Sequence, residues 1–271
     1  MPTTLYLSHL LPEVHPGVYQ QIKAACEGFG QPIDLVLGTR DIWVRDFMPI
    51  PLPDGRLLEY RYDPDYLQGA TAGTRGKKSN PDLICDAMGL QTVKTDLIID
   101  GGNVIRQGNT LIMADKVVGE NRFHYGKKAL KAKLMEDFQV KEVVFIPQDK
   151  KDRYGHADSM VRFIDDQTVL INYYYDDYGP VVNPLKGAGL HVKALELPGI
   201  KYTQGNYWPY LNFLQTDRLL LFTAIDPQLD AAVQQRLEQL YPAYRSKMAA
   251  IKMPEVTKKG GALNCISWSP K

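Results

Sequence analysis

The chain has 271 residues, with 32 Lys and Arg against 31 Asp and Glu and a formal net charge of +1. Its 44% hydrophobic and 23% charged residues are typical of a globular protein with a sizeable core. A net charge this close to zero gives no indication of a basic surface for nucleic acid or an anionic membrane. No apolar run approaches the roughly 20 residues of a membrane helix, and residues 1–10 lack a secretion signal. We therefore expect a cytoplasmic protein whose partner is a small molecule.

The N-terminal part of the chain alternates between predicted strands and helices. Residues 4–7, 18–29 and 33–37 indicate a strand, a helix and a second strand. Residues 44–60 predict a β-hairpin that turns at Pro53-Asp54-Gly55.

The central part of the chain gives the clearest unit. Residues 104–113 predict a hairpin with its turn at Gln107-Gly108-Asn109. A polar, Lys-rich helix through Leu130 and Leu134 follows, and then a buried strand at residues 143–146. The order of this unit is strand, strand, helix, strand.

The same order begins again twice towards the C-terminus. Residues 160–172 predict a hairpin that turns at Asp165-Asp166, and its closing strand is expected near residues 194–197. Residues 211–223 predict the next hairpin. Asp226-Pro227 then supplies an N-cap and a first-turn proline for a helix, whose apolar residues recur at helical spacing: Leu229, Val233, Leu237 and Leu240.

Two predicted strands remain without partners, one at residues 4–7 and one within residues 263–268. Joining them would complete a fifth unit and close a ring. The residues that begin the five hairpins follow one another at intervals of 57, 55, 54 and 53 positions: Asp46, Asn103, Asp158, Asn212 and Cys265. We therefore predict an α/β fold of five ββαβ units, a five-bladed α/β-propeller in a single domain over residues 1–271. Its central channel would collect these polar side chains.

The chain has three cysteines and no CxxC pair that would indicate zinc or a disulfide framework. Cys26 and Cys85 lie in helix-like sequence and are expected to be ordinary core residues. A Cys in an apolar strand is usually a small hydrophobic residue as well. Gly260-Gly261, however, allows close backbone approach before Cys265, which suits a reactive thiol at the end of a channel.

The segment Gly155-His156-Ala157-Asp158 places a possible base two residues from a carboxylate. On a strand these two side chains would share one face. The other four histidines show no compatible grouping, so we expect no metal site.

Asp46 follows Arg45 in an apolar segment, where the pair could form a surface ion pair. On a strand, Arg45 would instead point away and leave Asp46 free for a substrate cation. Asp100 precedes Gly101-Gly102-Asn103 and could equally be a turn residue.

Five motifs in this order resemble those of the agmatine deiminase and bacterial-type peptidylarginine deiminase family, whose fold is the five-bladed α/β-propeller called the pentein. They are Trp-x-Arg-Asp, an acidic residue before Gly-Gly-Asn, Gly-His-x-Asp, Tyr-Leu-Asn-Phe, and Gly-Gly-x-x-x-Cys. In this chain they begin at Trp43, Asp100, Gly155, Tyr210 and Gly260. The resemblance spans nearly the whole chain.

The resemblance implies a role for each matched residue. Cys265 would be the nucleophile, His156 the general acid and base, and Asp100 the support of His156. Asp46 and Asp158 would bind a guanidinium group, with Trp43 beside it. The chain departs from the family's usual pattern at three positions, with Asp100 for Glu, Met48 for Gly and Asn264 for His.

These residue types suit the hydrolysis of a guanidinium, because two carboxylates can hold the planar cation with strong charge-assisted hydrogen bonds. A thiolate can then add to its carbon and form an amidino-cysteine. We expect deimination of agmatine or an arginine derivative without a cofactor. Peptidylarginine deimination, amidino transfer, dihydrolysis of another guanidine, and a silent cation-binding protein are the alternatives. A homodimer is compatible with the sequence, which does not fix the oligomeric state.

Overall fold

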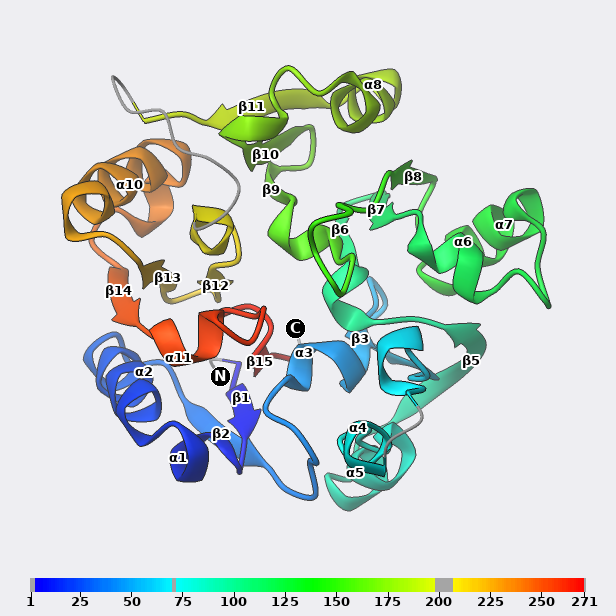
Figure 1. Ribbon diagram of the computed structural model, residues 1–271, viewed down its shortest axis with the longest axis horizontal. Coiled ribbons are helices and arrows are strands. Elements are labelled where there is room, and N and C mark those ends of the chain that lie inside the picture. The colour runs from blue at the N-terminus through cyan, green and yellow to red at the C-terminus, as the bar shows by residue number, and fades with distance from the viewer. Residues whose placement is uncertain (1–2, 70–71, 198–206, 271) are drawn as a thin grey trace.

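The computed structural model describes residues 3–69, 72–197 and 207–270. Within these residues, the strands form five three-stranded sheets. In every sheet the middle strand pairs antiparallel with one neighbour and parallel with the other. Figure 1 shows the five sheets and their helices arranged around a common centre. The chain is therefore an α/β protein built from five similar ββαβ units.

Each unit contributes a hairpin, at least one helix and a parallel closing strand. The first contains β3 (Ile50–Pro51), β4 (Leu57–Arg61), α4 (Ala72–Arg75), α5 (Pro81–Ala87) and β5 (Thr92–Ile98). The second contains β6 (Ile105–Gln107), β7 (Thr110–Ala114), α6 (Lys116–Glu120), α7 (Lys127–Asp137) and β8 (Glu142–Ile146).

The third and fourth units follow in the same order. The third contains β9 (Val161–Asp165), β10 (Thr168–Asn172), α8 (Gly179–Gly187) and β11 (His191–Leu195). The fourth contains β12 (Leu214–Gln215), β13 (Leu220–Ala224), α10 (Pro227–Leu240) and β14 (Met248–Lys252), and α11 (Pro254–Thr257) leads out of it. Helix α10 begins as its sequence predicts, because the Asp226 side chain accepts a hydrogen bond from the Gln228 N–H.

The two ends of the chain form the fifth unit together. It contains β15 (Ser267–Trp268), β1 (Leu5–Ser8), α1 (Leu11–Val14), α2 (Pro16–Gly28) and β2 (Ile33–Val36). Strand β15 pairs antiparallel with β1, with Tyr6 opposite Trp268. Figure 1 shows both ends of the chain in this unit. The predicted joining of the two unpartnered strands is confirmed.

The positions that begin the five hairpins differ from the prediction in their local backbone. Asp46 lies in α3 (Val44–Phe47), and Asn103 and Asp158 lie in the 3-10 turns η2 (Gly101–Asn103) and η3 (Ala157–Ser159). Asn212 closely follows a third such turn, η5 (Trp208–Tyr210). A strand was wrongly predicted at Asp46, within residues 44–60, and at Asn212, within residues 211–223, because short apolar runs do not distinguish a strand from a helical turn.

Four buried apolar clusters fill the molecule, and they include residues from neighbouring units. One of them combines β1 and α2 with residues of β13 and β14. This packing fixes each unit against the next and thereby fixes the short turns at the centre. None of the helices formed by residues 3–69, 72–197 and 207–270 has the length and apolar character needed to span a membrane.

Candidate active site

Polar side chains from several units meet in a buried cluster. Asp46, Asp100, His156, Asp158 and Cys265 are each at most 7% exposed. They come from the turns at the start of their units and from the end of β5. The structure therefore brings together the sequence-predicted catalytic residues and both predicted guanidinium-binding carboxylates. Trp43 lies beside the cluster, in the wall of the same cavity as Asp46.

His156 is held between two carboxylates. Its Nε2 atom lies 3.0 Å from Asp100 Oδ2, and its Nδ1 atom lies 3.7 Å from Asp46 Oδ1. Burial disfavours the charged imidazolium, but Asp46 and Asp100 outweigh that effect and raise the pKa of His156 to about 9. At neutral pH the ring is therefore a cation that can donate a proton.

Asp100 serves as more than a turn residue. Its side chain makes no capping bond to η2, and Oδ2 instead accepts from His156 Nε2 and from Lys116 Nζ. Burial raises the pKa of Asp100, yet His156 and Lys116 lower it below its ordinary value overall. The shorter Asp thus reaches the imidazole, as the resemblance requires of this position.

Asp46 has an oxygen available for a ligand. Its Oδ1 atom is buried and has no hydrogen-bond partner among the described residues. Arg45 does not occupy it, because Arg45 Nε donates to the Asn264 carbonyl across 3.3 Å. Burial raises the pKa of Asp46 to about 7, against the opposing effect of His156. The side chains of Arg45 and Asp46 thus have different partners, as predicted. The cause is a helical turn and not the strand that the sequence indicated.

Cys265 lies close to two oxygen acceptors. Its Sγ atom is 3.5 Å from Asp158 Oδ2 and 3.4 Å from Asn212 Oδ1. Burial, followed by the charges of Asp158 and Asp46, raises the pKa of Cys265 well above its ordinary value. Without a ligand the sulfur is therefore a thiol. Cys26 and Cys85 are buried in α2 and α5, as predicted.

His156 and Asp158 share a site for a different reason from the predicted one. They do not lie on a strand, since His156 is the N-cap of η3 and Asp158 lies within it. Both side chains nevertheless line a cavity of about 350 Å³ together with Cys265. The tight turn, rather than strand alternation, places them there.

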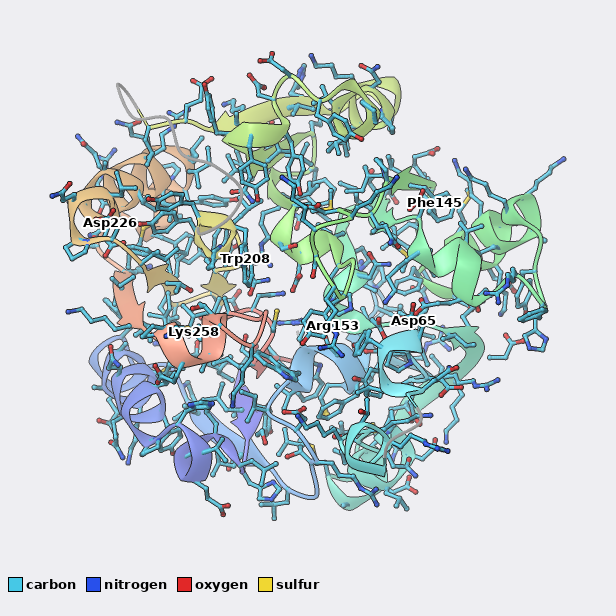
Figure 2. All side chains as sticks on the ribbon, viewed as in Figure 1. Asp65, Phe145, Arg153, Trp208, Asp226 and Lys258 are labelled. Atoms are coloured by element: carbon cyan, nitrogen blue, oxygen red, sulfur yellow. The ribbon has the colours of Figure 1, made fainter. Side chains whose placement is uncertain are left out.

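A second cavity of about 690 Å³ adjoins the first, and His156 and Cys265 line both. Asp46 and Trp43 line the second cavity, and Asp158 and Trp208 line the first. Figure 2 shows Arg153, which lines both, near the centre of the molecule, with Trp208 above it to the left and Lys258 to the left. The thiol and the imidazole therefore stand where the two cavities meet.

Aromatic side chains line the first cavity beside the reactive groups. Tyr174, Tyr175 and Trp208 form part of its wall, whereas Tyr207 stacks on Tyr210 with ring centres 6.1 Å apart. The first three side chains therefore face the cavity, whereas Tyr207 packs against another ring.

Two glycines allow the cluster to close. A Cβ at Gly102 would lie 2.5 Å from His156 Nδ1 and 2.8 Å from Asp46 Oδ1. A Cβ at Gly261 would lie 2.1 Å from the Trp43 ring. No side chain fits at either position, which gives a physical reason for the Gly-Gly pairs in the sequence.

Sequence reasoning missed three residues that organise the site. Lys116 binds Asp100, and Asn264 Nδ2 donates to Asp158 Oδ2 across 2.8 Å. Arg162 donates in turn to Asn264 Oδ1. Only Asn264 gave a signal, as a departure from the family's usual His. Across the described ranges, no three His, Cys, Asp or Glu side chains are grouped as a metal ion requires.

Comparison with known proteins agrees with this arrangement. The family model for the Porphyromonas-type peptidyl-arginine deiminases matches residues 13–270. A protein of Shewanella frigidimarina assigned as an agmatine deiminase is 24% identical over 278 residues, covering 85% of this chain and 74% of the relative. A similar assignment in Shewanella baltica is 24% identical, and the match covers 66% of this chain but only 58% of the relative.

A solved structure shows the same fold. The agmatine deiminase of C. jejuni, with its substrate bound, superposes with a TM-score of 0.73 at 19% identity, covering 99% of this chain and 93% of the other. The family match extends over almost the entire length of the sequence. The chain therefore belongs to the Porphyromonas-type peptidyl-arginine deiminase family.

Proposed function

We propose that this chain hydrolyses the guanidino group of agmatine or of an arginine derivative to a ureido group and ammonia. One observation carries the proposal: the Cys265 thiol, the His156 imidazole with its Asp100 partner, and the carboxylates of Asp46 and Asp158 are buried together beside two adjoining cavities. Family membership and the relatives assigned as agmatine deiminases support the same reaction.

In this proposal Asp46 and Asp158 bind the guanidinium. Asp46 offers an unpartnered oxygen in one cavity, and Asp158 lines the other. Burying a cation is costly unless it is paired, and two carboxylates supply that pairing. Trp43, in the wall beside Asp46, would cover the planar group. The guanidinium carbon would then lie between the carboxylates and near Cys265.

Binding of the cation would also activate Cys265. The charges of Asp158 and Asp46 are among the causes that keep its pKa high. A guanidinium between them offsets both charges and adds a positive charge beside the sulfur, so the thiol proton can leave to solvent. The nucleophile therefore forms when its substrate arrives.

The chemistry proceeds in two halves. The thiolate of Cys265 adds to the guanidinium carbon and forms a tetrahedral adduct. His156 donates its proton to one nitrogen of that adduct, the carbon–nitrogen bond breaks, and ammonia leaves an amidino-cysteine behind. The neutral His156 then takes a proton from water as the water attacks the same carbon. The carbon–sulfur bond breaks with its electron pair on the sulfur of Cys265, which takes the remaining water proton as the hydroxyl becomes the ureido carbonyl. The ureido product leaves, and His156 is again an imidazolium. Asp100 keeps the ring oriented through both transfers.

The five units, on this proposal, are the blades of a five-bladed α/β-propeller of the pentein type that forms one domain over residues 1–271. The ring closed by β15 and β1 supports it, as do the hairpin-starting turns that gather at the centre. The central channel would hold the two joined cavities.

A substrate panel tests the function directly. Ammonia and ureido product are measured with agmatine, free arginine, arginyl peptides and small guanidino acids, with and without an added amine as acceptor. Acid quenching followed by mass spectrometry should reveal an amidino adduct on Cys265. Guanidinylated amine in place of ureido product would indicate amidino transfer. A protein that binds these guanidines but turns over none of them would be a silent cation-binding member of the fold.

A further inference from the structure

Lys116 is a buried cation beside the pair formed by His156 and Asp100. Its side chain is 5% exposed, and its Nζ atom donates to Asp100 Oδ2 across 2.7 Å. It lines neither of the two joined cavities. It therefore lies behind the reactive groups, where it does not meet a substrate.

The same ammonium group has further partners on other segments. It donates to the Tyr154 carbonyl across 2.9 Å and lies 3.3 Å from Glu120 Oε1, one turn along α6. It also stands 4.9 Å from the centre of the Tyr66 ring, within the range of a cation–π contact. Lys116 thus joins the end of β5, the segment before His156, and its own helix.

The backbone around this lysine is closely packed. Gly155, between Tyr154 and His156, has a φ of +66°, and a Cβ there would lie 3.4 Å from Lys116 Cδ. The aliphatic part of the Lys116 side chain packs against the segment that carries His156, and its hydrogen bond to the Tyr154 carbonyl holds the same segment in place. A shift of this lysine would move both partners of the His156–Asp100 hydrogen bond.

One oxygen of Asp100 connects the two cations. Oδ2 accepts from Lys116 Nζ and lies 3.0 Å from His156 Nε2, while Oδ1 has no hydrogen-bond partner in the described part of the chain. When only one oxygen of a buried carboxylate accepts hydrogen bonds, the donors to that oxygen fix the orientation of the carboxylate. Lys116 is the donor that stays charged when His156 gives up its proton.

We infer that Lys116 is a positioning residue for the reaction: it holds Asp100 against His156 and fixes the segment that carries the imidazole. This inference rests on the proposed deimination. It assigns no contact with substrate to Lys116, so its removal should slow the chemical step and leave substrate binding unchanged.

The test compares steady-state kinetics of wild type, Lys116→Met and Lys116→Arg on the best guanidine of the panel. Lys116→Met should lower kcat roughly tenfold to a hundredfold, as loss of an outer partner does for metal-bound histidines, with KM changed less than about twofold. Lys116→Arg, which keeps a charged donor, should recover most of kcat. Full kcat in Lys116→Met, or an equal loss in both variants, would overturn the inference.

A matched control is Lys133→Met in α7, which removes the ion pair between Lys133 and Asp137, two residues that line neither cavity. It should keep wild-type kcat and KM. Thermal unfolding checks that each variant is folded. If Lys116→Met unfolds, Lys116→Gln replaces it. Its neutral amide is a weaker donor to Asp100, so its loss of kcat should be smaller than that expected for Lys116→Met but larger than that of Lys116→Arg.

A double-mutant cycle with Asp100→Asn separates positioning from general loss of structure. Because Lys116 acts on both partners of the His156–Asp100 hydrogen bond, adding Lys116→Met to Asp100→Asn should slow the reaction by much less than Lys116→Met slows the wild type. Multiplied losses would show that Lys116 acts independently and would refute the inference. An inactive wild type would overturn the proposed function and this inference with it, whereas an active wild type with unaffected variants overturns only the inference.

Discussion

The turns that begin the five units carry two kinds of residue with different surroundings. Asp46, Asp158 and Cys265 line the cavities, whereas Asn103 and Asn212 do not. Each Asn is fully buried and uses its side-chain oxygen on backbone N–H groups. Equivalent positions in the repeat therefore serve either the cavity or the framework around it.

The two asparagines bind the next unit along the chain. Asn103 Oδ1 accepts from the N–H of Ala157, next to Asp158, across 3.3 Å. Asn212 Oδ1 accepts from the N–H groups of Asn264 and Cys265 across 3.1 and 3.4 Å. The amides of units two and four thus hold the turns that present Asp158 and Cys265. A repeat can build a site by alternating residues that react with residues that hold them.

The largest effect on turnover is expected at Cys265, one of the three hairpin-starting residues that line the cavities. Cys265→Ala should lower turnover of the best guanidine at least ~10³-fold, because no other nucleophile replaces the thiol. The rate of ureido product formation measures it. Cys85→Ala, which removes a buried thiol from α5, should keep wild-type turnover. Turnover by Cys265→Ala at the wild-type rate would contradict the assignment.

Asp158→Asn should lower the activity somewhat less than Cys265→Ala does. Removing one charge from a buried pair costs roughly 2–5 kcal/mol, and this should appear in kcat/KM for a guanidinium substrate. Asp165→Asn is the matched control, since Asp165 is an exposed carboxylate at the end of β9, the strand that follows the turn carrying Asp158. Comparable losses in both variants would argue against a special role for Asp158.

The pH dependence separates Asp46 from Asn103, which occupies the same position but cannot titrate. As pH falls through about 7, Asp46 gains a proton and loses the charge that holds the cation. As pH rises through about 9, His156 loses the proton that ammonia needs. A plot of kcat/KM should therefore fall by at least tenfold per pH unit below about 7, where protonation of Asp46 adds to that of the thiol, and the loss of the His156 proton should stop its rise above about 9. A flat profile between pH 5 and 7 would contradict the role of Asp46.

The smallest effects on activity should come from the framework amides. Asn103→Ala leaves the Ala114 and Ala157 N–H groups without their partner and should lower the free energy of unfolding by about 1–3 kcal/mol. Asn212→Ala should do the same and also lower kcat, because Asn212 Oδ1 lies 3.4 Å from the sulfur. Denaturant unfolding measures both. Asn109→Ala, in an exposed hairpin turn, should change stability by less than about 0.5 kcal/mol.

Much of the fold could be predicted because its signals are local and repeated. The hairpin at Ile105–Gln107 and Thr110–Ala114 follows from β-rich runs around a Gly turn, and α10 follows from its Asp226-Pro227 start. The turn around Asp46 was wrongly predicted as a strand. Its hydrogen bond from the Met48 N–H to the Val44 carbonyl closes a helical turn, which the apolar pattern of so short a segment does not distinguish from a strand.

The sequence by itself determined the five-unit spacing and the residue types of the site, because both depend only on which residues occur and at which positions along the chain. Tertiary structure decided which of those residues meet. The contact of Asp100 with His156 spans 56 positions, and that of Asn264 with Asp158 spans 106. Lys116 shows the limit most clearly, since a lysine after a strand normally faces solvent. Only the packing of three separate segments around it makes Lys116 a buried partner of Asp100.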